Sequence, residues 1–150
     1  MTTVTRRVAC RPQAVLDVLA DGWSYATWVV GTSAIRHVSD DWPRADARVD
    51  HSFGVWPLTI DDFTEVHAWR PGSGIDLLVR GWPAGEAHVR IDVRSAGPGC
   101  EVRIVEDAVS GPGLLVPRIV RQAILHARNS ETLRRLALLA EGGANRSPVP

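Results

Sequence analysis

Hydrophobic and polar residues repeat with helical spacing over the last third of the chain, from Leu115 to Glu141. At about 100° per residue, one side of this segment is apolar or small, whereas arginines gather roughly opposite it. The pattern predicts one long amphipathic helix with Pro117 in its first turn and Gly142 and Gly143 at its end. The stripe expected to be buried is Leu115, Ile119, Ala123, His126, Ser130, Leu133, Ala137 and Ala140, and the arginines expected to be solvated are Arg118, Arg121, Arg128 and Arg135.

The middle of the chain, between residues 33 and 107, has the shorter period of β-strands. Apolar and polar residues alternate there in short runs that glycine and proline interrupt. The alternation is cleanest in Glu86–Arg94 and indicates an antiparallel sheet with one face in water. The expected strands are Thr2–Ala9, Ser33–Ser39, Ala47–Gly54, Leu58–Trp69, Gly74–Gly81, Glu86–Arg94 and Cys100–Asp107.

Two short helical segments are predicted between the first and second strands. Pro12 fits the first turn of a helix that Gly22 ends, and an aromatic cluster of Trp23, Tyr25 and Trp28 follows. A seven-stranded antiparallel sheet and a helix with one apolar stripe bury each other best when the sheet curls around the helix. We therefore expect an α+β fold of this kind, with an interior cavity that is suited to a ligand.

Composition limits the classes of protein that fit. The chain has 17 basic residues, all of them arginine, and 17 acidic residues, so its formal net charge is zero and we predict no nucleic-acid partner. No apolar run approaches the length of a membrane span, and the N-terminus lacks the apolar core of a signal peptide. We expect a cytoplasmic protein with no integral membrane segment. A single domain over 1–141 and a disordered tail over 142–150 are predicted.

Several segments of the chain resemble the START-like or SRPBCC superfamily, and within it the actinobacterial polyketide cyclase/dehydrase-like branch. They are RPQAVLDVLADGWSYATWVVG, IRHVSDDWPRADARVDHSFGVWPL, GWPAGEAHVRIDV, EDAVSGP and RNSETLRRLALLAE, and with the opening strand they cover about residues 2 to 141. The resemblance implies a helix-grip (Bet v 1/START-like) fold that binds hydrophobic small molecules such as lipids, sterols, polyketides or quinones. Only some members of the superfamily are enzymes, so the fold does not choose between binding and catalysis.

Three residues are the predicted acid/base candidates: His126, Glu106 and His51. His126 lies in the apolar stripe of the long helix, where burial would keep its imidazole neutral. His51 and Glu106 share the strand phase of apolar neighbours and are expected to face inward. A carboxylate against an imidazole in a dry cavity could enolise a ketone or dehydrate an alcohol. The structural alternatives are a core histidine bonded to a carbonyl or tryptophan, and a glutamate that holds the loop 107–113.

Large aromatic side chains and small helix residues are expected to line the pocket. Core packing explains some of them equally well, and Trp56 and Trp82 precede prolines, which favours turns at the rim. The chain has no GxGxxG, P-loop, HExxH or GxSxG motif, and its two cysteines lack metal or redox spacing, so we predict no cofactor and no metal. The predicted lining is Tyr25, Trp28, Phe53, Trp56, Phe63, Trp69, Trp82, Ile119, Ala123 and Ser130.

The favoured hypothesis is a binding module that holds one hydrophobic or aromatic metabolite, such as a lipid or a polyketide, between the sheet and the long helix. The first alternative is a polyketide cyclase or dehydratase that uses His126 with Glu106 or His51. The second alternative is a protein-interaction module, which would show an exposed apolar patch in place of a cavity. The sequence does not decide the ligand, or whether the protein is a monomer or a dimer.

Overall fold

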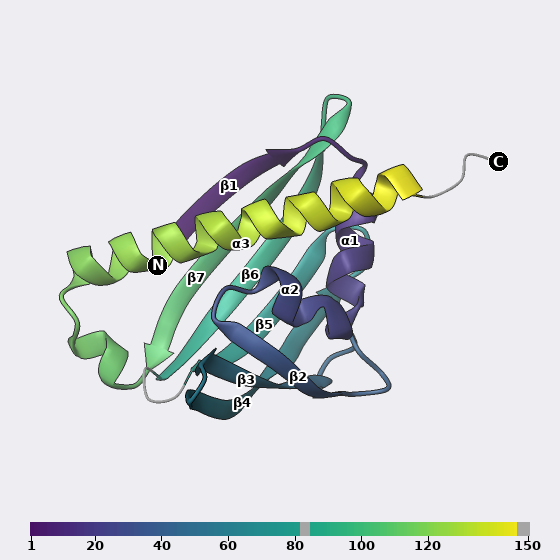
Figure 1. Ribbon diagram of the computed structural model, residues 1–150. Coiled ribbons are helices and arrows are strands. Elements are labelled where there is room, and N and C mark those ends of the chain that lie inside the picture. Colours follow the sequence, from purple (N-terminus) through teal and green to yellow (C-terminus); the bar gives the residue numbers. More distant parts are fainter. Residues whose placement is uncertain (82–84, 147–150) are drawn as a thin grey trace.

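The computed structural model describes residues 1–81 and 85–146, so the predicted pocket residue Trp82 lies outside the described part. Within these residues, seven strands form one antiparallel sheet in the order β1-β7-β6-β5-β4-β3-β2, and the sheet curls around a long C-terminal helix (Figure 1). The elements are β1 (Thr2–Val8), α1 (Pro12–Ala20), η1 (Gly22–Ser24), α2 (Tyr25–Trp28), β2 (Thr32–Val38), β3 (Arg48–Val55), β4 (Leu58–Arg70), β5 (Gly74–Gly81), β6 (Gly85–Ala96), β7 (Gly99–Ser110), η2 (Pro112–Leu115) and α3 (Arg118–Arg146).

The order of the strands follows the chain from β2 to β7, and β1 then pairs with β7 from Thr2 opposite Glu106 to Val8 opposite Cys100. Because each strand reverses the direction of the one before it, β3, β5 and β7 all end at the same edge of the sheet. The first turns of α3 lie over this edge (Figure 1). The predicted α+β architecture, with the sheet around the long helix, is therefore confirmed.

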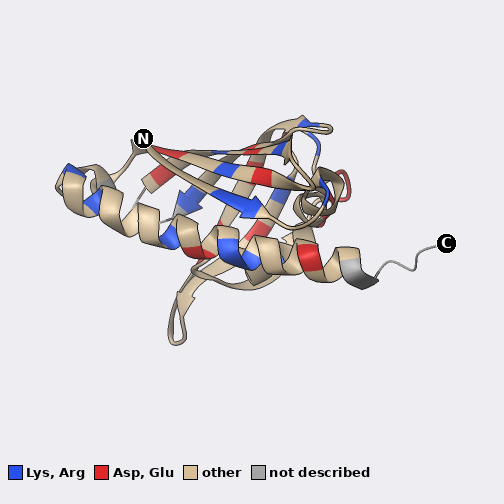
Figure 2. Ribbon diagram, turned by 90° about the horizontal axis from the view of Figure 1, so that it is seen from above, with Lys and Arg blue, Asp and Glu red and all other residues tan. Residues whose placement is uncertain are grey.

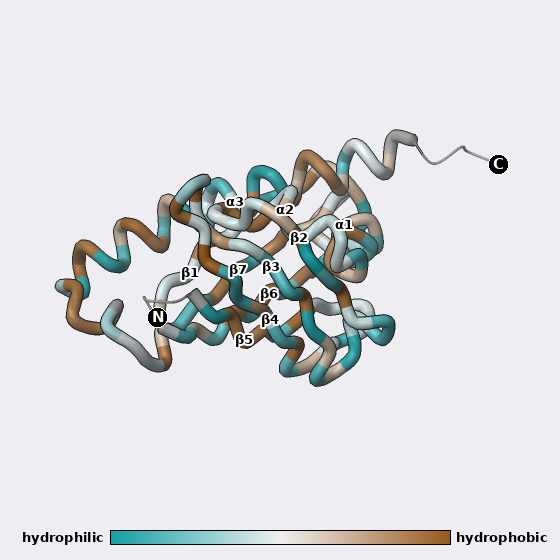
Figure 3. The backbone as a smooth tube through the Cα atoms, turned by 60° about the horizontal axis from the view of Figure 1, so that its bottom comes forward, coloured by the Kyte–Doolittle hydropathy of each residue, from teal (hydrophilic) through white to brown (hydrophobic). Residues whose placement is uncertain are grey.

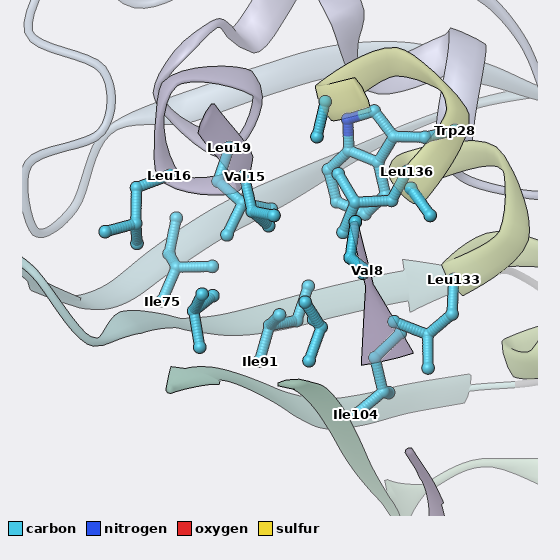
Figure 4. Packing of buried hydrophobic residues seen from close by; sticks show 14 of the residues in the cluster. Val8, Val15, Leu16, Leu19, Trp28, Ile75, Ile91, Ile104, Leu133 and Leu136 are labelled. Atoms are coloured by element: carbon cyan, nitrogen blue, oxygen red, sulfur yellow. The ribbon is translucent and has the colours of Figure 1, made fainter. Parts of the chain in front are cut away.

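The core lies between the sheet, the C-terminal half of α3, and α1 with α2. Its contribution from α3 is Leu133, Leu136, Ala137 and Ala140, which are at most 3% exposed. Their spacing of three and four residues puts them on one face of the helix, where each leucine contributes roughly 2 kcal/mol by leaving water. Figure 4 shows Leu133 and Leu136 among aliphatic side chains of the sheet and of α1. The labelled partners there include Val8, Val15, Leu16, Leu19, Ile75, Ile91 and Ile104.

The predicted stripe of α3 is correct in its C-terminal half and wrong in its N-terminal half. Leu115 and Ile119 are 85% and 83% exposed, and Ala123 and His126 are exposed as well. The physical reason is that the first turns of α3 extend past the edge of the sheet, where no other element of the described residues packs against that side of the helix (Figure 1). Towards the middle of α3, the face that meets the sheet carries Asn129, which is 3% exposed, in place of His126.

The end of α3 also differs from the prediction. The helix continues through Gly142 and Gly143 to Arg146, and residues 147–150 of the predicted tail lie outside the described part. A glycine permits the left-handed turn that ends a helix but does not impose it. One turn earlier, Glu141 Oε1 accepts a hydrogen bond of 2.9 Å from the backbone N–H of Ala9, which ties this end of α3 to the end of β1.

Two smaller findings complete the comparison with the sequence. Cys10 and Cys100 are both free and buried, and burial raises the pKa of the Cys100 thiol to about 11. Among the described residues, no helix combines the length and the apolar character that crossing a membrane requires.

Candidate functional site

Two neighbouring hollows lie between the sheet and α3: a deeper inner cavity and an outer groove. The inner cavity has a volume of about 50 Å³ and is lined from α2, β3, β5, β6, β7 and α3. This space holds a few water molecules and is too small for a drug-sized ligand. Most of its wall is aliphatic or aromatic, and its polar members are Thr32, His51, Arg80, Glu106, Arg128, Asn129 and Thr132.

The outer groove, of about 230 Å³, lies between the first half of α3 and the ends of β5, β6 and β7. Its wall includes Val116 and Ile124 of the overhanging part of the molecule. Glu106 and Arg128 line the inner cavity and the outer groove alike. These two side chains therefore stand at the boundary between the two spaces.

Glu106 is a buried carboxylate, 3% exposed, that α3 holds in place. Its Oε2 accepts hydrogen bonds from Arg128 Nη2 and from Asn129 Nδ2, the latter at 2.8 Å. The Arg128 side chain is 31% exposed, so the prediction that it is solvated is wrong: the carboxylate of Glu106 draws it into the site. A buried carboxylate needs such donors, because an unpaired buried charge is costly.

A second polar group lies deeper, around the hydroxyl of Thr64. Tyr25 Oη is 2.8 Å and His51 Nε2 is 3.0 Å from Thr64 Oγ1, and the rings of Tyr25 and His51 stack with centroids 5.4 Å apart. Burial lowers the pKa of His51 and raises the pKa of Tyr25 to about 12, because both sites disfavour the charged form. Both side chains are therefore neutral at physiological pH.

Arg80 Nε pairs with Glu86, but three other polar atoms of the inner lining are buried without a hydrogen-bond partner in the described part of the chain. They are Trp28 Nε1, Thr32 Oγ1 and His51 Nδ1. Buried polar groups are hydrogen-bonded in the great majority of cases, so exceptions indicate a water or a ligand. The three residues come from α2, β2 and β3, which meet at this end of the cavity.

The predicted acid/base residues are only partly brought together. His51 and Glu106 are buried and line the inner cavity. His126 is exposed on α3, so its predicted place in the cavity is wrong: Asn129, one turn further on, occupies the inward face instead. The predicted pairing of His126 with a carboxylate is therefore absent among the described residues. Glu106 instead contacts Arg128 and Asn129.

Of the predicted pocket aromatics, Tyr25, Trp28 and Phe53 line the inner cavity. Trp56 is 84% exposed at the β3–β4 turn, because the turn projects beyond the sheet. Phe63 is adjacent to the buried Thr64 on β4, so its side chain lies on the other face of the sheet. The guanidinium groups of Arg48 and Arg80 lie 4.4 Å from the centroid of its ring.

The remaining predicted lining residues also lie elsewhere. Trp69 is half-buried and packs against the core. Ile119 and Ala123 are exposed, and the hydroxyl of Ser130 donates to the backbone carbonyl of His126 at 2.7 Å. Ile119 and Ala123 belong to the N-terminal half of α3, where the predicted stripe is wrong because the helix extends past the sheet.

Five polar residues of the cavity were not predicted from the sequence: Thr32, Arg80, Arg128, Asn129 and Thr132. Asn129 and Thr132 precede Leu133 and Leu136 with helical spacing, so they continue the buried face of α3 towards its N-terminus. A stripe traced backwards from the leucines would have found them. Arg128 has no such signal, because only the contact with Glu106 distinguishes it from the solvated arginines.

Comparisons with known proteins give the fold. No family model and no curated protein matches the sequence. One similar solved structure is the di-domain ARO/CYC StfQ from the steffimycin biosynthetic pathway, at 13% identity and a TM-score of 0.74, covering 95% of this chain and 51% of that one. A conserved protein from Geobacillus kaustophilus has 15% identity and a TM-score of 0.74 over 93% of this chain and 94% of that one.

Ara h 8.0201 is similar as well, at 10% identity and a TM-score of 0.71, and the match covers 93% of this chain and 96% of that one. At such low identities the likeness concerns the fold, and the site has to carry the argument about function. The chain therefore has the helix-grip fold of the START-like (SRPBCC) superfamily, as the resemblance in its sequence predicted.

Proposed function

We propose that this protein binds one hydrophobic small molecule, such as a lipid or polyketide, that carries a neutral hydrogen-bonding group. The observation that supports the proposal is the set of unpartnered polar atoms of Trp28, Thr32 and His51 in a mostly apolar cavity. Leaving a buried donor or acceptor unpaired costs about 1–3 kcal/mol. A ligand oxygen that accepts from the indole N–H of Trp28 removes that cost, so the site favours a ligand with a carbonyl or hydroxyl group.

The charge state of the site supports a neutral polar group over an anionic one. His51 is uncharged because burial lowers its pKa, and Tyr25 keeps its proton because burial raises its pKa to about 12. The carboxylate of Glu106 lines the same space and repels a second negative charge. Ketones, quinones, phenols and alcohols therefore suit the inner end of the site.

The size of the ligand depends on the Glu106–Arg128 pair. The inner cavity of about 50 Å³ admits only a small group, whereas the outer groove beside it offers about 230 Å³. Together they approach the lower limit of roughly 300 Å³ for sites that hold drug-sized ligands. Arg128 is partly exposed and can turn towards solvent while Asn129 keeps its bond to Glu106. The ligand would then extend from the groove into the cavity.

Native mass spectrometry of the protein purified from its own host, followed by thermal unfolding with a panel of quinones, flavonoids and fatty alcohols, tests the proposal. We expect a retained or stabilising compound in the wild type and loss of that effect in Trp28→Phe, which lacks the indole N–H. Trp42→Phe is the matched control, because Trp42 Nε1 already donates to the carbonyl of Leu19 at 3.1 Å. The proposal fails if no compound binds, or if Trp28→Phe binds as tightly as Trp42→Phe.

The second candidate function is a cyclase or dehydratase that acts on a polyketide-like substrate in the same cavity. The observation in its favour is the neutral imidazole of His51, whose Nδ1 has no hydrogen-bond partner in the described part of the chain. In the tautomer that carries its proton on Nε2 and donates to Thr64, Nδ1 would take a proton from a bound ketone or alcohol. Glu106 is held by two donors and fits the role of orienting Arg128 and Asn129 better than that of a base. Product formation from the retained compound, lost in His51→Gln with binding preserved, would identify an enzyme.

A further inference from the structure

Large apolar side chains are exposed in two segments near the edge of the sheet where β3 and β7 end. Val55, Trp56 and Leu58 at the β3–β4 turn are 82%, 84% and 82% exposed. Leu115 at the end of η2 is 85% exposed, and Ile119 and Val120 in the first turn of α3 are 83% and 50% exposed. We call these six residues the apolar rim. Both segments lie at the edge of the sheet where β3 and β7 end (Figure 1), and the first turns of α3 are strongly hydrophobic (Figure 3). An apolar surface of this kind marks a site of association.

The charged residues of the first half of α3 are all basic. Between Asp107 and Glu131 the chain contains Arg118, Arg121 and Arg128 and no acidic residue. Figure 2 shows this asymmetry as blue bands alone on the first half of α3. The formal net charge of zero for the whole chain does not show this local excess of basic residues.

Three carboxylates close to this edge are already paired with cations. Asp61 lies 3.5 Å from Arg36 Nε, Glu86 lies 2.9 Å from Arg80 Nε, and Asp107 pairs with the N-terminal amine at 2.9 Å. Arg128 pairs with Glu106, so Arg118 and Arg121 are the basic residues of α3 that lie next to the rim. The rim thus combines exposed apolar side chains with positive charge, as helices that lie in the interface of an anionic bilayer do.

A second copy of the chain fits the same surface less well. A symmetric dimer through the apolar rim would bring Arg118 and Arg121 of both copies to one interface, because an isologous contact uses the same patch twice. Like charges that face each other across an interface are unfavourable. A bilayer with anionic headgroups accepts both the apolar side chains and the arginines.

We propose that the apolar rim docks the protein on the surface of an anionic lipid bilayer, with the first half of α3 lying in the interface. In this orientation the outer groove opens towards the lipid, because two residues of its wall lie next to the rim: Val116 follows Leu115, and Ile124 lies one turn after Val120 on α3. Docking does not depend on the proposed ligand, and the two can be tested separately.

Co-sedimentation of the ligand-free protein with lipid vesicles tests the proposal. We expect binding to vesicles of equal parts phosphatidylcholine and phosphatidylglycerol, weaker binding to phosphatidylcholine alone, and a fall in binding at high salt. Leu115→Ser combined with Ile119→Ser should lower the partition coefficient at least about tenfold, since both side chains leave water on docking. Arg118→Gln combined with Arg121→Gln should remove the preference for anionic vesicles.

Two controls separate docking from general effects. Leu138→Ser removes an apolar side chain that is 56% exposed on α3 but lies far from the rim, and Arg44→Gln removes an exposed arginine from the opposite edge of the sheet. Both should bind vesicles like the wild type, with unchanged thermal unfolding. The proposal is overturned if the wild type ignores anionic vesicles at low salt, or if the rim variants bind equally well. It is also overturned if the rim instead holds a concentration-dependent dimer that does not sediment with lipid.

Discussion

The carboxylate of Glu106 on β7 and the guanidinium of Arg128 on α3 meet at the boundary between the inner cavity and the outer groove. The contact joins the last strand to the middle of the helix across the site. Asn129 is the second donor to Glu106, so the carboxylate keeps one partner when Arg128 moves. The same contact can therefore hold the helix on the sheet and still let a ligand pass.

Breaking this pair from one side should be costly. Arg128→Met leaves Glu106 buried with one donor, and we expect a loss on the order of 3 kcal/mol in the free energy of unfolding. Adding Glu106→Leu removes the stranded charge and should restore most of the loss. Denaturant unfolding of the four proteins in this cycle measures the coupling. The exposed pair of Glu131 and Arg135 is the matched control, and its cycle should give a much smaller coupling than the cycle of Glu106 and Arg128.

The stability of the protein should depend on pH through His51. Burial lowers the pKa of His51 in the folded state below the ordinary value of 6.5. As the pH falls through 6.5, the unfolded state therefore binds a proton at this residue before the folded state does. The stabilisation is complete above the unfolded pKa and is lost as the pH falls. We therefore expect the Tm to fall between about pH 7 and pH 5, and the fall to be smaller in His51→Gln. The exposed His126, replaced by Gln, should leave the slope as in the wild type.

Much of the fold could be predicted because its signals are local. Alternation within each strand and the glycines and prolines between strands gave all seven strands to within a few residues, as in Leu58–Trp69 against the observed β4. Strand phase also put His51 and Glu106 on the buried face. These patterns depend on one face of a sheet being dry, which holds along most of this chain.

The candidate site could be predicted less well, because it depends on where α3 overhangs the sheet. Ile119 and Leu133 are both apolar, but only Leu133 has a sheet beneath it. Sequence periodicity shows which side of a helix is apolar, but it does not show whether another element packs against that side. The polar residues Asn129 and Thr132 interrupt the apolar pattern where the helix faces the cavity, so a search for apolar periodicity passes over them.

The hydroxyl of Thr64 should matter more to stability than either of its partners does. Thr64→Val keeps the shape of the side chain but leaves both Tyr25 Oη and His51 Nε2 without their bond, and we expect a loss of about 2–3 kcal/mol. Tyr25→Phe removes one polar group together with its bond and should cost about 1 kcal/mol. Chemical denaturation of both variants decides the order. Equal losses would mean that water replaces Thr64 in the cavity.

The face that α3 presents to the sheet can be tested with the same substitution at two positions one turn apart. His126 is exposed, so His126→Leu should change the free energy of unfolding by less than about 0.5 kcal/mol and leave ligand binding intact. Asn129 is 3% exposed and donates to Glu106, so Asn129→Leu should cost about 1–3 kcal/mol, because it removes a donor from a buried carboxylate. Urea unfolding of the two variants measures the difference. If His126→Leu proved the more damaging, His126 and not Asn129 would face the sheet, and the cavity lining assigned to α3 would be wrong.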